Sequence, residues 1–90
     1  MEKEPRHLIL GVHLTNRVRD APSVQKILTQ FGCNIRTRIG LHRTDEQRCS
    51  PEGLILLELI GDDATCQDLA NQLAVLTGIE VKQMVFEHPD

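Results

Sequence analysis

The sequence predicts a two-layer α+β fold, with a four-stranded antiparallel sheet and two helices on one face of it. Apolar residues alternate along some segments, as in strands, and recur at three- and four-residue steps along two others, as in helices. The segments follow the order strand, helix, strand, strand, helix, strand. Two right-handed strand–helix–strand units in this order interleave into the βαββαβ sandwich called ferredoxin-like. We therefore expect residues 1–90 to form one domain, with its core in residues 7–86.

The first half predicts a strand, a helix and a second strand. Residues 7–14 place four aliphatic side chains on one face of a strand. A polar connection, 15–19, leads to Asp20, which we expect to cap the first helix, with Pro22 in its first turn. The apolar stripe of that helix comprises Ala21, Val24, Ile27, Leu28 and Phe31. Gly32 is expected to end the helix in the left-handed conformation, and a strand follows over 33–43.

The second half repeats this order after a polar loop over 44–52. Residues 53–61 form a nearly continuous apolar strand, which is typical of a central position in the sheet. Asp62 or Asp63 caps the second helix. Its apolar stripe comprises Cys66, Leu69, Ala70, Leu73 and Leu76. Gly78 ends that segment, and residues 79–86 predict the last strand.

One face of the predicted sheet is left without helices. We expect it to carry Ile9, Gly11, His13, Arg36, Arg38, His42, Leu54, Leu56, Glu58 and Ile60. Glu58 would take Arg36 or Arg38 as its charge partner, because an unpaired buried carboxylate is costly. The face is too apolar to lie in water, so we expect another chain to cover it or to extend the sheet edge. The predicted partner is a second copy, in a dimer or tetramer, since so small a core is often stabilised by oligomerisation.

Composition excludes several classes of partner and location. The net charge of −3 argues against direct nucleic-acid binding, which depends on basic side chains at phosphates. No apolar run approaches the roughly 20 residues of a membrane span, so no membrane partner is expected. The three cysteines, Cys33, Cys49 and Cys66, do not form a disulfide pattern. With no apolar leader segment at the start, these features predict a cytoplasmic protein.

The connection between the first strand and the first helix is a candidate ligand site. Free backbone N–H groups at a helix N-terminus suit a carboxylate or phosphate. The predicted ligand-binding residues are Asn16, Arg17, Asp20 and Arg38. The alternative is a helix-entry loop whose polar residues are simply solvated.

A metal site is the second candidate. His42 ends a predicted strand and Cys49 lies in the following loop, and His13 could join them. Imidazole and thiolate bind nickel, zinc or copper, although a partner chain would have to complete the coordination shell. The alternative is a half-buried histidine and a loop thiol. Cys33 and Cys66 lie near apolar stripes and are expected to be small core residues.

Catalysis finds little support in the sequence, and we expect a protein that is not an enzyme. GxSxG, P-loop and GxGxxG motifs are missing, and the pattern places no paired carboxylates. The residues therefore identify no cofactor. RNA-recognition modules share this order of elements but stack bases on aromatic residues of the middle strands, and residues 53–60 contain none. Acylphosphatases also have this order of elements, but they need a glycine-rich phosphate-binding loop after the first strand, and residues 15–19 are not glycine-rich.

A longer pattern of residues resembles a known family. It comprises Asn16-Arg17, Ala21, Val24-Gln25, Ile27-Leu28-Thr29, Gly32, Ile35, Arg38–His42, Cys49, Gly53–Ile55, Glu58-Leu59, Gly61 and Gly78–Lys82. The pattern, which covers about residues 8–86, is similar to that of short bacterial proteins described as regulators of the iron-only hydrogenase system. The resemblance implies an ACT-like ferredoxin fold, similar to the C-terminal domain of nickel-responsive regulators. It also implies an oligomer with a small-ligand or metal-sensing role, although the His-x-His pair of those regulators is missing here.

These observations lead to one functional hypothesis and two alternatives. The leading hypothesis is a homo-oligomeric, ACT-like regulatory module that binds a small molecule near residues 15–20 and signals through a separate partner. The first alternative is a transition-metal sensor that uses His42 and Cys49. The second is a structural adaptor without a ligand.

Overall fold

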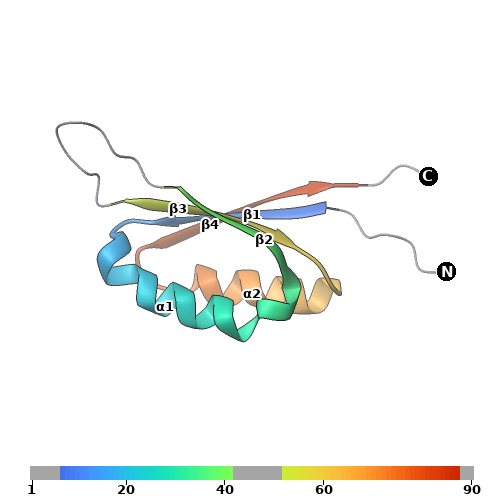
Figure 1. Cartoon of the computed structure of the whole chain (residues 1–90), viewed down its shortest axis with the longest axis horizontal. Helices are drawn as coiled ribbons and strands as arrows, with labels where there is room; N and C mark the ends of the chain where they lie inside the picture. Colours follow the sequence, from blue (N-terminus) through green and yellow to red (C-terminus); the bar gives the residue numbers. More distant parts are fainter. Residues whose placement is uncertain (1–6, 42–51, 88–90) are drawn as a thin grey trace.

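The predicted ferredoxin-like fold is confirmed by a computed structural model, which describes residues 7–41 and 52–87. Its elements are β1 (His7–Leu14), α1 (Arg17–Gln30), β2 (Ile35–Leu41), β3 (Gly53–Leu59), α2 (Asp63–Ala74) and β4 (Ile79–Phe86). The four strands form one antiparallel sheet in the order β2-β3-β1-β4. Both helices lie on the same side of this sheet (Figure 1).

The core lies between the sheet and the two helices and is almost entirely aliphatic. The central strands β1 and β3 supply Leu10, Val12 and Leu57, all of which are fully buried. The apolar stripes of α1 and α2 pack against them as their spacing predicts, except that Ala21 is exposed and lies outside the core. Within the described ranges, no helix is long and apolar enough to cross a membrane.

Helix α1 begins four residues earlier than its sequence pattern suggested. Asn16, not Asp20, is the N-cap, and its side-chain oxygen accepts a hydrogen bond from the Arg19 backbone N–H at 3.1 Å. Asp20 lies in the first turn and accepts from the Asn16 backbone N–H at 3.0 Å. The prediction that Asp20 caps the helix was therefore wrong. The Asn16 side chain bonds an N–H group that follows it in the first turn, and the Asp20 side chain bonds the N–H group of the cap residue that precedes it.

Helix α2 begins as predicted, with Asp62 as its N-cap. Its carboxylate accepts from the Thr65 backbone N–H at 3.0 Å and from the Thr65 hydroxyl at 2.9 Å.

The predicted role of Gly32 was wrong: it has no positive φ and begins a short 3₁₀ turn, Gly32–Asn34. Cys33 lies in that turn and is exposed, contrary to its predicted place in the core, whereas Cys66 is buried as expected.

A β-bulge near the start of β2 changes which side chains face the helices. Thr37 pairs with Glu58, Arg38 with Leu57 and Ile39 with Leu56, after a register shift between Ile35 and Thr37. The extra residue inverts the alternation beyond it. The prediction that Arg38 lies on the helix-free face was therefore wrong. Arg38 lies on the helix side, and Thr37 and Ile39 take the other face.

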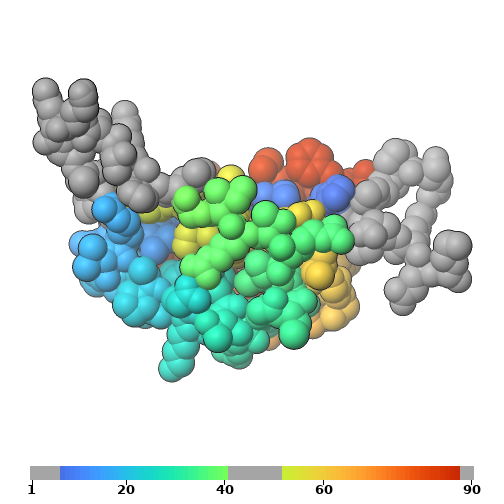
Figure 2. Space-filling view, in the orientation of Figure 1, coloured from blue at the N-terminus to red at the C-terminus, as the bar shows by residue number. Residues whose placement is uncertain are grey.

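We call the side of the sheet opposite the helices the bare face. It is the surface formed by the outward residues of β1 (7, 9, 11, 13), β2 (37, 39), β3 (54, 56, 58) and β4 (80, 82, 84, 86). Figure 2 shows the side chains of β4, in red, standing above the sheet on this side. The predicted residue His42 lies outside the described residues.

Candidate functional site

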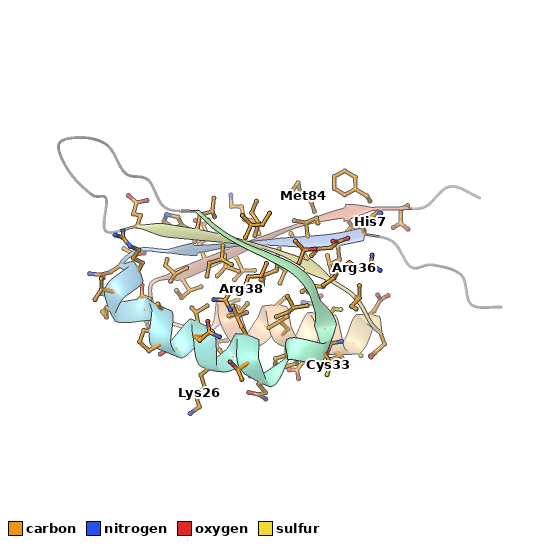
Figure 3. The ribbon with its side chains drawn as sticks, viewed as in Figure 1. His7, Lys26, Cys33, Arg36, Arg38 and Met84 are labelled. Atoms are coloured by element: carbon orange, nitrogen blue, oxygen red, sulfur yellow. The ribbon has the colours of Figure 1, made fainter. Side chains whose placement is uncertain are left out.

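A groove runs between α1 and the sheet at its β2 edge. Its volume is about 400 Å³. The lining residues are Arg17, Val18, Ala21, Pro22, Val24, Gln25, Arg38 and Ile55. The predicted ligand-binding residues Arg17 and Arg38 thus come together, one from the start of α1 and the other from β2. In Figure 3, Arg38 lies on the helix side of the sheet, between β2 and α1.

The groove combines two cations with largely apolar walls. The Arg38 Nη2 donates a hydrogen bond to the Gln25 Oε1 at 2.5 Å. The Arg17 Nη1 lies 3.4 Å from the backbone oxygen of Glu52, to which it donates. Gln25 is neutral and therefore orients the Arg38 guanidinium without neutralising it. None of the described residues that line the groove is acidic and two of them are arginines, a composition that favours an anion.

Helical spacing explains how α1 forms its wall of the groove. Val18, Ala21, Pro22 and Gln25 recur at three- and four-residue steps and share one side of the helix. Val18 is strongly exposed there although it is apolar. Gln25 is the residue that the sequence prediction missed. Its spacing from Arg17 and Val18 was the signal that could have placed it beside them.

The other two predicted ligand residues, Asn16 and Asp20, do not line this groove. Asp20 is only 7% exposed, and its carboxylate accepts from the Arg19 Nε at 2.8 Å as well as from the Asn16 N–H. The hydrogen bond from Arg19 holds the pKa of Asp20 below its usual value. Nearby, the Thr15 hydroxyl donates to the Gly78 carbonyl at 2.8 Å. The Thr15 contact ties the residues just before α1 to the turn before β4.

A second polar cluster lies on the bare face around Glu58. The Thr37 hydroxyl donates to the Glu58 Oε1 at 3.0 Å, and the His7 Nδ1 lies 3.2 Å from Oε2. Arg36 is the predicted charge partner, with its Nη1 3.9 Å from Oε2. The hydrogen bond from Thr37, helped by His7 and Arg36, lowers the pKa of Glu58.

The lowered pKa values of Asp20, Glu58 and Asp62 predict a fold that weakens in acid. For Asp62 the cause is the pair of hydrogen bonds from Thr65. The unfolded chain binds these protons at about pH 4, whereas the folded chain binds them only at lower pH. Their stabilisation is therefore complete above that pH and is lost as the pH falls through the folded-state values. We expect urea unfolding to give a lower free energy of unfolding at pH 3 than at pH 6.

The matched control for this pH dependence is Asp62→Asn. Asparagine can still cap α2, but it cannot titrate. The difference in unfolding free energy between pH 6 and pH 3 should therefore be smaller in this variant than in the wild type. Equal stability of the wild-type protein at the two pH values would contradict the prediction.

The predicted metal ligands His42 and Cys49 lie outside the described residues. The Nε2 atom of His13, the third candidate, lies 2.8 Å from the Glu52 Oε1. In the part of the chain that the structure describes, no three His, Cys, Asp or Glu side chains are grouped so as to hold a metal ion. The Cys66 thiol lies 3.5 Å from the Ile60 carbonyl, to which it donates.

Known proteins share the fold of this chain over most of its length. No protein-family model and no curated protein sequence matches it. The uncharacterized protein TM1266 from Thermotoga maritima is 27% identical, with a TM-score of 0.76 over 91% of this chain and 98% of that one. The C-terminal domain of MgtC from Mycobacterium tuberculosis is 14% identical, with a TM-score of 0.67 over 98% and 95% of the two chains.

A third solved structure is described as a dimeric ferredoxin-like protein from an uncultured marine organism. It is 10% identical, with a TM-score of 0.53 over 94% of this chain and 96% of that one. At such low identity, the likeness to this protein and to the MgtC domain demonstrates the ferredoxin-like fold alone. None of the three is described as an enzyme.

Proposed function

We propose that this protein is a regulatory module without catalytic activity, which assembles with copies of itself and binds a small anionic molecule in the groove between α1 and β2. One observation carries the ligand proposal. Arg17 and Arg38, from separate elements, line the same largely apolar cavity. The bulge in β2 is what turns Arg38 toward this cavity.

The chemistry of the groove favours a small carboxylate with a short aliphatic part. A guanidinium can donate two parallel hydrogen bonds to a carboxylate, and two guanidiniums can share one anion. Val18, Ala21 and Ile55 offer apolar contact for the rest of the molecule. The volume of about 400 Å³ lies near the lower end of ligand pockets, which span about 300–1,000 Å³. Amino acids and 2-oxo acids of moderate size have this chemistry.

The regulatory part of the proposal is supported by the resemblance to regulators of the iron-only hydrogenase system. Assembly is supported by the dimeric state of one protein with the same fold and by the exposed apolar side chains of the bare face. The proposed signal then passes through a separate partner protein.

A thermal-shift screen followed by calorimetry tests the ligand proposal. Branched and unbranched amino acids, the corresponding 2-oxo acids and nucleotides form the panel, and at least one carboxylate is expected to raise the melting temperature. Arg38→Gln should weaken binding of that compound by about tenfold or more, since a hydrogen bond to a charged group contributes about 1.5–3 kcal/mol.

The matched control is Lys26→Gln, which removes one cation from the same helix. Lys26 points away from the sheet in Figure 3 and does not line the groove. Its replacement should leave binding unchanged. The proposal fails if no compound of the panel binds, which would favour an adaptor without a ligand. It also fails if Arg38→Gln binds as tightly as the wild type.

A further inference from the structure

The bare face of the sheet is covered by no helix or strand of the described residues. Both helices pack on the opposite side, and in the described ranges nothing packs on this one (Figure 1). We propose that a second copy of this chain covers the bare face, so that two sheets pack face to face. This assigns an interface to the assembly named under the proposed function. It does not depend on the ligand groove.

Apolar residues form a band across the bare face, in neighbouring register positions. Ile39, Leu56 and Gly11 are register neighbours on β2, β3 and β1. Ile9 and Met84 are register neighbours in the next row. The edge strands contribute the most exposed side chains, with Ile39 49% and Met84 53% exposed. Figure 3 shows Met84 standing on the side of the sheet away from the helices. An apolar band of this kind marks a contact surface.

Gly11, at the centre of the band, gives an independent reason to expect a close neighbour. It has no positive φ. A Cβ atom at this position would lie 3.8 Å from the Leu56 Cδ2 and 3.9 Å from the Lys82 carbonyl oxygen, which are ordinary contact distances. The chain itself therefore does not require glycine here. Glycine in a strand interior costs stability and often marks a place where another molecule approaches the backbone closely.

The charges on and beside the bare face suit a second copy better than a charged partner. Glu58 lies 3.9 Å from Arg36, and Glu80 lies 3.8 Å from Lys82. Each of these two carboxylates has a cation beside it, and Glu52, beside His13, adds one further carboxylate. The described charges on and beside the face therefore leave only a small negative excess, so two identical surfaces of this kind repel each other only weakly. A nucleic acid or an anionic lipid surface would need a positive excess.

The area of the bare face is sufficient for a specific dimer. Four strands about 4.8 Å apart, each about eight residues long at about 3.3 Å per residue, span a flat area of about 500 Å². Two copies would bury about 1,000 Å² before the relief of the side chains is added, which reaches the lower limit of specific interfaces. Two packed sheets would lie about 10 Å apart with their side chains interdigitated.

Light scattering coupled to size exclusion tests this interface, at about 100 µM protein. The wild-type chain is expected to have at least twice the 10.2 kDa mass of one copy. Ile39→Lys on β2 and Met84→Lys on β4 each place a charge in the apolar band and should shift the protein to the single-chain mass. Gly11→Val should weaken association at least tenfold, because its branched side chain occupies the space of the approaching partner.

Val75→Lys is the matched control, because Val75 is an apolar residue at the end of α2 that is also strongly exposed. It should leave the mass unchanged. Circular dichroism of each variant checks that it is folded. If Ile39→Lys does not fold, Met84→Lys decides the test. A monomeric wild type would overturn the interface, and so would oligomers that persist in the lysine variants of the bare face. Arg38→Gln should remain oligomeric, which separates this result from a failure of the ligand proposal.

Discussion

Replacing Leu57 with alanine is expected to lower the free energy of unfolding by about 3–4 kcal/mol, within the range measured for buried leucines. Leu57 is fully buried in the central strand β3, where it pairs with Leu10 of β1. The side chain belongs to the buried core cluster, so the surrounding elements would have to move to fill the cavity. A chain of 90 residues has a total stability of about 5–13 kcal/mol. The substitution therefore removes a large part of it.

Urea unfolding followed by circular dichroism measures this effect. The control is Val75→Ala, which shortens an exposed apolar residue at the end of α2 and should change the free energy of unfolding by less than about 0.5 kcal/mol. Equal stabilities of the two variants would show that the core is not organised around β3 as described.

The fold could be predicted because most of its segments carry one-sided patterns. In β1, alternate aliphatic residues fall on the helix side, and Leu10 and Val12 are fully buried there. In α2, the stripe that includes Leu69 and Leu73 is buried as its spacing predicts. The cap Asp62 and the bounds of β4, Ile79–Phe86, also agree with the structure. These features depend on neighbours close in sequence, which a pattern of residues records directly.

The bulge in β2 could not be predicted in the same way. Ile35, Thr37 and Ile39 alternate without interruption, so the pattern assigned them to one face. The inversion beyond Ile35 depends on the register of β2 against Leu59 and Glu58 of β3. Cross-strand register is set by tertiary pairing, which local alternation does not contain.

The candidate site shows the same division between local and tertiary information. Asn16 and Asp20 are polar residues at a helix entry, and the sequence does not distinguish a pair that bonds within the turn from a pair that binds a ligand. In the structure, both side chains accept hydrogen bonds from backbone N–H groups of the same helix turn. Arg17 and Arg38 reach a common groove only because the bulge turns Arg38 toward α1.

Strand β2 links the two proposed surfaces. Arg38 lies on its helix side and lines the groove, whereas the adjacent Ile39 lies on the bare face and is half exposed. A ligand that holds Arg38 thus contacts the strand that contributes to the interface. The paired variants at these two positions test the surfaces separately, because each substitution changes one face of the strand.

Replacing Gly61 with alanine is expected to lower the free energy of unfolding by about 2–4 kcal/mol, from backbone strain of about 1–3 kcal/mol and a lost hydrogen bond of about 1 kcal/mol. Gly61 follows β3 with a φ of +108°, which L-residues with side chains rarely adopt. A Cβ atom here would collide with the Asn34 side-chain amide. That amide donates to the Ile60 carbonyl at 3.0 Å.

This contact connects the turn after α1, in the first half of the fold, to the end of β3, in the second half. The Ile60 backbone N–H in turn donates to the Asn34 carbonyl at 2.8 Å, so the turn after α1 is fastened to the end of β3 at two points. Gly40→Ala is the matched control, because Gly40 has no positive φ and open space where its Cβ would lie. It should leave the urea midpoint unchanged or raise it slightly. If the two variants have equal urea midpoints, the contact between Asn34 and Ile60 does not stabilise the fold as described.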